Sequence, residues 1–235
     1  MRLPDFLIVG AQKCGTTSTR INLERHPHIA FNCGGPRSRE LHFFDRESNW
    51  ARGWQWYARH FTEPAPMIGE KTPNYLQTHC IERMHKTVPN ARLIVLLRNP
   101  VARAYSQWNH FNQVPSASAS DWRISSFATA LERFPSLLRT GEYVTALSDL
   151  LNVWDHDRVG VWITERVQQD LRGAYAEMFA FLGLESHPEL RFAEHHRRRY
   201  LLPLKPDDKH RLEIYYAPFN AALRELLNDP LPEWS

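Results

Sequence analysis

The chain has 235 residues, of which 43% are hydrophobic and 23% are charged. This length and composition exclude a disordered or fibrous protein and are sufficient for one sizeable core or at most two small domains. The formal net charge of +3 is too small to indicate a nucleic-acid partner, so any anion must be bound by individually placed cations.

The first predicted element is a strand at residues 5–10, a continuous apolar run that ends in glycine, as in strands buried on both faces. A loop then runs to residue 17, and residues 18–25 are predicted to form a helix that the His26-Pro27 step closes. The order strand, loop, helix is typical of an α/β protein.

Four aromatic residues follow at helical spacing: Trp50, Trp54, Tyr57 and Phe61. The spacing places their rings on one face of a helix. We expect this face to pack on the core, and an aromatic platform for a ligand is the alternative.

Later segments repeat the pattern, with strands predicted at 92–97 and 159–163 and helices at about 100–113 and 171–182. Pro100 suits the first position of a helix, and Gly183 suits a helix end. Residues 114–126 are predicted to form a Ser-rich mobile surface loop. We predict one α/β domain over residues 1–235, with a central, mostly parallel sheet flanked by helices and ligands at the carboxyl ends of the strands.

Residues 10–17 (GAQKCGTT) join the first predicted strand to its helix, which is the position of a phosphate-binding loop. The amides of Gly15, Thr16 and Thr17 would face an anion at the helix N-terminus. A Walker A loop has its lysine directly after the second glycine, whereas here Lys13 precedes it. Taken alone, the segment could equally be an ordinary strand-to-helix turn.

The residue after the second strong strand is Arg98, where a Walker B strand would offer an acid to hold a metal. A metal-free transfer therefore fits better, and none of the twelve histidines forms an HExxH pair. Arg98 at the strand end and Ser106 two turns into the next helix could hold a second phosphate. A solvated loop arginine is the alternative for Arg98.

Cys14, Cys33 and Cys80 form no CxxC pair, which argues against a disulfide framework and against a zinc ribbon. The apolar run before Gly10 is too short for a signal peptide, and no later run is long enough to span a membrane. Because the chain also begins at its own Met1, we expect a bacterial cytoplasmic enzyme with no integral membrane segment.

The KxGTT loop paired with R-x7-S resembles the signature of the sulfotransferases that use 3'-phosphoadenosine 5'-phosphosulfate (PAPS). Further segments resemble the carbohydrate branch of that family, in particular the heparan sulfate N- and O-sulfotransferases. These segments are residues 40–45 (ELHFFD), Gly53 with Trp56-Tyr57, residues 70–75 (EKTPNY) and residues 231–234 (LPEW). The resemblance implies a P-loop-like sulfotransferase fold and PAPS as the donor substrate, with no metal.

The resemblance also implies how the donor is bound. The first loop, with Lys13, Cys14, Gly15, Thr16 and Thr17, would hold the 5'-phosphosulfate. Arg98 and Ser106 would bind the 3'-phosphate, and the segment around Arg198 would close over the nucleotide. This last segment departs from the Lys-Gly-Arg pattern of the family, because Arg197 replaces the glycine.

Three further residues match catalytic positions of the family. Glu40 would be the general base that deprotonates the acceptor hydroxyl, a role suited to a positioned carboxylate. If its segment is extended, His42 lies on the same face and could orient Glu40 or bind the acceptor. Lys71 would join Lys13 in stabilising the transferring sulfonate. Taken singly, Glu40 would be interpreted as a surface acid, His42 as a partly buried structural histidine and Lys71 as a solvated charge. Their joint occurrence in the order of the family favours the catalytic interpretation.

The predicted function is transfer of a sulfuryl group from PAPS to a hydroxyl of a carbohydrate, glycolipid or secondary metabolite, with release of PAP. The alternatives are a P-loop kinase or NTPase, and a glycan-binding module without transfer activity. The expected partner is a small-molecule or glycan acceptor and not a nucleic acid. The oligomeric state stays open, with a homodimer among the states allowed.

Overall fold

The computed structural model describes residues 1–32, 40–113, 126–195, 200 and 203–234. Cys33, Arg198 and residues 114–125 of the predicted surface loop lie outside this part of the chain. The chain forms two compact units: Met1–Leu97 with Asp149–His196, and Arg98–Ser148 with Arg197–Ser235. A single domain over residues 1–235 stays a prediction.

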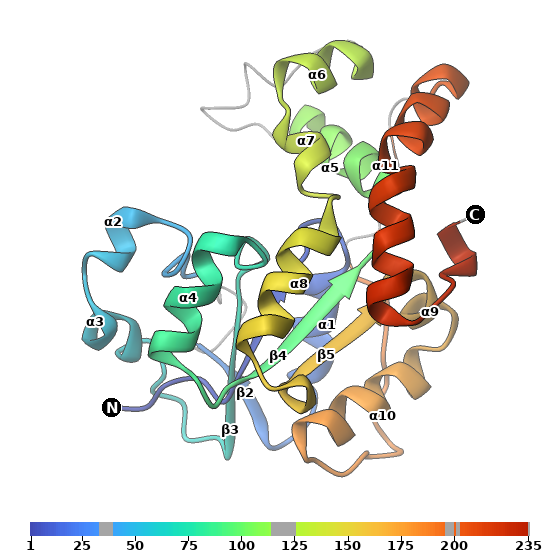
Figure 1. Ribbon diagram of the computed structural model, residues 1–235. Coiled ribbons are helices and arrows are strands. Elements are labelled where there is room, and N and C mark those ends of the chain that lie inside the picture. The colour runs from blue at the N-terminus through green and yellow to red at the C-terminus, as the bar shows by residue number, and fades with distance from the viewer. Residues whose placement is uncertain (33–39, 114–125, 196–199, 201–202, 235) are drawn as a thin grey trace. The chain divides into compact units, whose positions relative to one another are not determined.

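A five-stranded parallel sheet forms the centre of the first unit (Figure 1). Its order is β2-β3-β1-β4-β5, with β1 at Phe6–Gly10, β2 at Ile29–Phe31, β3 at Met67–Lys71, β4 at Arg92–Leu97 and β5 at Val159–Ile163. Every strand pair is parallel, and the strands predicted at residues 5–10, 92–97 and 159–163 are β1, β4 and β5. The predicted sheet is confirmed.

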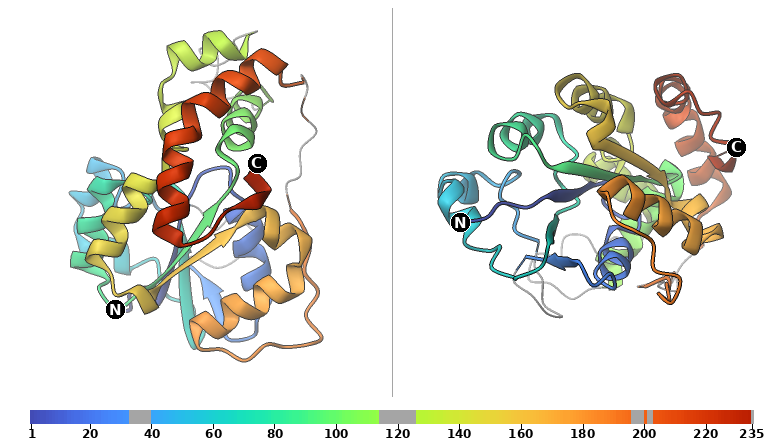
Figure 2. Two further views of the ribbon diagram at one scale, coloured as in Figure 1. Left: turned by 45° about the vertical axis from the view of Figure 1, so that its right-hand side comes forward. Right: turned by 90° about the horizontal axis from the view of Figure 1, so that it is seen from below.

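Helices cover both faces of this sheet, with α4 on one face and α1 and α10 on the other (Figure 2). The helices of the first unit are α1 (Thr16–Leu23), α2 (Glu47–Trp50), α3 (Trp54–Ala58), α4 (Thr78–Thr87), α9 (Thr164–Gln169) and α10 (Leu171–Leu182), with a 3-10 turn η2 (His156–Arg158). Gly183 ends α10 in the left-handed conformation, as predicted. Helix α1 begins two residues before its predicted start, directly after Gly15.

The prediction of one aromatic helix around Trp50–Phe61 is wrong. Gly53, with φ 79° and ψ 163°, separates the short helices α2 and α3, so the four aromatic residues do not share one helical face. Tyr57 and Phe61 are buried in the core, whereas Trp54 is 48% exposed. The backbone freedom of this glycine overrides the periodicity of the aromatic residues.

The second unit is helical. Its elements are α5 (Pro100–Gln113), α6 (Phe127–Arg133), α7 (Ser136–Arg139), α8 (Tyr143–Val153, whose end belongs to the first unit), α11 (Pro206–Leu227) and a 3-10 turn η3 (Pro232–Trp234). Helix α5 begins at Pro100 as predicted, and the Asn99 Oδ1 atom accepts the amides of Val101 and Ala102. The unit has its own apolar core, which includes Trp108, Leu137 and Tyr216. No helix in the described part of the chain is long and apolar enough to cross a membrane.

Gly69 on β3 gives a direct test of the sheet packing. It pairs with Phe6 of β1, and a Cβ atom at this position would overlap the Phe6 ring. Gly69→Ala should therefore lower the free energy of unfolding by about 1–3 kcal/mol, as overpacking in a filled core does, measured by urea denaturation. The double variant Phe6→Leu/Gly69→Ala should lose less than the sum of the two single variants. Strict additivity would contradict this packing.

Candidate active site

The candidate site lies where neighbouring parallel strands end. Gly10 is the last residue of β1 and Lys71 the last residue of β3, and these two strands pair directly. The carboxyl ends of parallel strands meet at one edge of the sheet, where α/β proteins bind ligands. The loop at residues 11–15 and the side chain of Lys71 therefore start from the same edge.

The loop after β1 has the backbone of an anion-binding turn. Gly15 caps α1 with φ 82°, and Lys13 also has a positive φ, of 70°. The first backbone N–H groups of α1 have no acceptor within the helix, so they can donate hydrogen bonds to an anion at its N-terminus. Thr164, at the start of α9, donates its hydroxyl to the Cys14 carbonyl oxygen at 2.9 Å and so fixes the loop. Nothing in the sequence pattern signalled this contact.

Lys71 connects this loop to the predicted base. Its Nζ atom lies 2.5 Å from Glu40 Oε1 and 3.5 Å from Thr17 Oγ1. The side chain of Lys71 is only 8% exposed, whereas that of Glu40 is 36% exposed and so remains accessible. One ammonium group therefore contacts both the carboxylate and the first turn of α1.

His42 holds the other oxygen of the same carboxylate. Its Nε2 atom lies 3.4 Å from Glu40 Oε2, and its Nδ1 atom lies 2.8 Å from Asp45 Oδ2. The segment is not extended as expected, because His42 has φ 50°. This left-handed turn, rather than alternation along a strand, brings the two side chains together.

The contacts shift the pKa values of both groups. Burial opposes ionisation of Glu40, but hydrogen bonds from His42 and Lys71 and the charge of Lys71 outweigh it and lower its pKa to about 2. The hydrogen bond to Asp45, followed by the one to Glu40, raises the pKa of His42 to about 9. At neutral pH the site thus holds an ionised carboxylate between two cations.

Arg98 and Ser106 belong to the second unit: Arg98 lies two residues before α5, and Ser106 lies within this helix. Both are partly exposed. The Tyr143 hydroxyl donates to the Arg98 carbonyl oxygen at 2.8 Å, and an Arg98 Nη2 atom lies 3.5 Å from the Tyr200 hydroxyl. Their binding of a phosphate stays a prediction.

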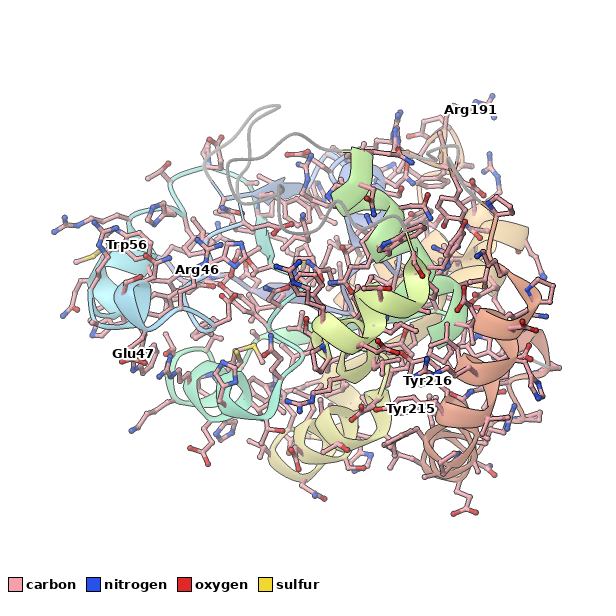
Figure 3. The ribbon with its side chains drawn as sticks, turned by 90° about the horizontal axis from the view of Figure 1, so that it is seen from above. Arg46, Glu47, Trp56, Arg191, Tyr215 and Tyr216 are labelled. Atoms are coloured by element: carbon pink, nitrogen blue, oxygen red, sulfur yellow. The ribbon has the colours of Figure 1, made fainter. Side chains whose placement is uncertain are left out.

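The structure brings the side chains of Thr17, Glu40, His42 and Lys71 together, and their roles in catalysis and donor binding stay predictions. Sequence reasoning assigned no role to Asp45, although its position three residues after His42 was the available signal. The next two residues, Arg46 and Glu47, lie at the start of α2 (Figure 3). Among the described residues, no group of three or more His, Cys, Asp or Glu side chains could hold a metal ion.

Comparison with known proteins gives matches over most of the chain. The family model of the sulfotransferase domain matches residues 3–205. Human bifunctional heparan sulfate N-deacetylase/N-sulfotransferase 3 is 28% identical over an alignment of 272 residues, which covers 99% of this chain and 31% of that protein. Membrane-associated sulfotransferase kil1 of Dictyostelium discoideum is 40% identical over 116 residues, covering 47% of this chain and 23% of its own length. The chain thus spans a third or less of the length of these relatives.

Solved structures give a similar result. A sulfotransferase from Alicyclobacillus acidocaldarius superposes with a TM-score of 0.79 at 27% identity, covering 100% of this chain and 99% of that one. Mouse sulfotransferase SULT7A1, solved with PAP, gives a TM-score of 0.65 at 14% identity and covers 93% of this chain and 84% of its own, a likeness of fold alone. The predicted α/β fold is therefore the fold of solved sulfotransferases.

The Asp45–His42 contact can be tested by NMR titration of the imidazole. Asp45→Asn should lower the pKa of His42 from about 9 toward its ordinary value of 6.5. A raised pKa in the folded state stabilises the protein below pH 6.5, and this contribution is lost as the pH rises through about 9. The fall in unfolding free energy between pH 7 and pH 10 should therefore be smaller in the variant. An unshifted His42 titration would contradict the contact.

Proposed function

Because the chain belongs to the sulfotransferase domain family, we propose that it transfers a sulfuryl group from PAPS to a carbohydrate hydroxyl and releases PAP. The observation that carries this proposal is the position of Lys71, whose Nζ atom contacts both Glu40 and Thr17. A base and a donor-binding loop joined by one cation suit an in-line transfer between a bound donor and an adjacent acceptor.

In this mechanism, the acceptor hydroxyl attacks the sulfur atom of PAPS while Glu40 takes its proton. A bond forms between the acceptor oxygen and sulfur, and the bond from sulfur to the bridging phosphate oxygen breaks. The electron pair leaves with PAP, and Lys13 at the loop stabilises the charge that develops on the bridging oxygen. No metal is needed for any of these proton and charge movements.

Lys71 would interact with two anionic groups during this reaction, the Glu40 carboxylate and the transferring sulfonate. In the structure it contacts Glu40, and its charge helps to keep the pKa of that carboxyl at about 2. The transferring sulfonate would lie beside Thr17 and compete with Glu40 for the same ammonium group. As Lys71 turns toward the sulfonate, Glu40 loses a cationic partner and becomes a stronger base at the moment when it must accept a proton.

The acceptor is proposed as a carbohydrate from the family resemblance and from the relatives whose names include heparan sulfate. Those names also specify N-sulfotransferase, which makes an amine the second candidate acceptor atom. A matched pair of polysaccharides, one fully N-acetylated and one de-N-acetylated, distinguishes the two in assays with radiolabelled PAPS. Label on the N-acetylated polymer supports a hydroxyl acceptor, and label on the de-N-acetylated polymer alone supports an amine.

Glu40→Gln tests the base. The amide keeps the size of the side chain but cannot take the acceptor proton, so turnover should fall by about 100-fold or more, while PAP affinity changes by less than about threefold. Glu47→Gln is the matched control, because Glu47 lies in the same segment but pairs with Arg83 at 2.5 Å. Equal turnover in the two variants, or loss of PAP binding in Glu40→Gln, would overturn the role of Glu40.

Arg98→Ala tests recognition of the 3'-phosphate. Loss of a charged hydrogen bond should weaken PAP binding by about 10- to 100-fold. The affinity for adenosine 5'-monophosphate, which has no 3'-phosphate, should change by less than about threefold. Arg92, at the opposite end of β4, provides the control variant Arg92→Ala. Equal weakening of both nucleotides in Arg98→Ala would contradict the assignment.

A further inference from the structure

Glu70 is a fully buried carboxylate that the mechanism above does not use. It precedes Lys71 on β3, so their side chains lie on opposite faces of the sheet. Its side chain accepts hydrogen bonds from the hydroxyls of Thr72 at 2.6 Å, Tyr57 at 2.7 Å and Tyr75 at 3.0 Å. Burying such a group costs free energy unless it is hydrogen-bonded. The three hydroxyl donors offset this cost and fix the position of the Glu70 side chain.

Two of these three hydroxyl groups also accept hydrogen bonds from the backbone of the segment that follows Glu40. Thr72 Oγ1 accepts the backbone N–H of His42 at 3.5 Å, and the Tyr75 hydroxyl accepts the backbone N–H of Phe43 at 2.9 Å. The backbone of Leu41 bonds to Glu70 directly. Three consecutive residues that follow Glu40 are thus tied to one buried carboxylate.

The tied segment has a conformation that needs such support. His42 has φ 50°, in the left-handed region that residues with a side chain rarely adopt. From its other side, Asn49 Nδ2 donates to the carbonyl oxygens of Leu41 at 3.0 Å and His42 at 3.1 Å. In this conformation the imidazole reaches both Glu40 and Asp45.

We infer that Glu70 is a positioning residue, which acts through the Thr72 and Tyr75 hydroxyls to hold the backbone of residues 41–43 so that His42 contacts Glu40. The inference rests on the proposed function, in which Glu40 is the base. Glu70 contacts no reacting atom and acts only through this hydrogen-bonded relay. Loss of the relay should therefore impair proton transfer and leave the donor site intact.

The chain contains a matched pair of residues for the test. Tyr57 and Tyr75 are both fully buried, and both donate a hydroxyl hydrogen bond to Glu70. Only the Tyr75 hydroxyl also accepts a backbone amide from the base segment in the bonds described. Tyr57→Phe and Tyr75→Phe each keep the ring and remove one donor from Glu70, but Tyr75→Phe also leaves the Phe43 amide without its acceptor, so it should be the less stable of the two. They differ in the relay alone.

We expect Tyr75→Phe to lower kcat by about 10- to 100-fold, the cost of displacing a catalytic group by about an ångström. PAP affinity should stay within about twofold of the wild type. NMR titration should move the pKa of His42 from about 9 toward 6.5. Tyr57→Phe should change kcat by less than about twofold and leave the pKa of His42 at about 9, although it also loses a hydrogen bond to Glu70.

Thr72 gives an independent second comparison. Thr72→Ser keeps the hydroxyl relay and should behave as the wild type, whereas Thr72→Val removes it and should behave as Tyr75→Phe. The inference is overturned if Tyr75→Phe and Tyr57→Phe show equal kcat and equal His42 titrations, or if Thr72→Val matches Thr72→Ser. If the wild type transfers sulfate to no acceptor, the proposed function fails, and the His42 titrations still decide the positioning role.

Discussion

The ammonium group of Lys71 is the contact on which the candidate site depends. It lies 2.5 Å from the Glu40 carboxylate and 3.5 Å from the Thr17 hydroxyl, on a side chain that is 8% exposed. Partial burial strengthens each charge interaction relative to bulk water. Binding of an anion at the loop and the basicity of Glu40 are therefore linked through a single cation.

The strand β3 explains how this cation is placed. Alternation along a strand directs Lys71 toward the site and Glu70 into the buried hydroxyl cluster on the opposite face. Lys71 holds the Glu40 side chain, and Glu70 holds the backbone that follows Glu40. Two neighbouring residues of one strand thus determine both the charge and the position of the proposed base. A distortion of β3 should disturb both together.

Strands β1, β4 and β5 could be predicted because they are runs of mostly apolar residues. The other two were not predicted, since β2 has only three residues and β3 carries the charged Glu70 and Lys71. The limits of α5 and α10 follow from Pro100 and Gly183, which constrain the backbone locally. The aromatic spacing around Trp54 misled the helix prediction, because the backbone at Gly53 does not follow side-chain periodicity. Local signals were thus reliable where backbone preference and burial agreed.

The site was only partly predictable from sequence. The resemblance placed Glu40, His42 and Lys71 in one site, but it implied nothing about the left-handed turn at His42 that joins them. The contact of Glu70 with Leu41 joins residues nearly thirty positions apart, and no periodicity in the sequence encodes such a contact. Roles that depend on tertiary hydrogen bonds emerge only once the strands and loops are placed.

The linkage through Lys71 is tested most directly by the titration of the Glu40 carboxyl group. Carbon NMR of protein labelled at its glutamate side chains reports the pKa of this group, which is about 2 without ligand. With PAPS bound and no acceptor present, we expect the pKa of Glu40 to rise, because the sulfonate draws Lys71 away and adds negative charge nearby. An unchanged or lower pKa in the presence of PAPS would contradict a cation shared between donor and base.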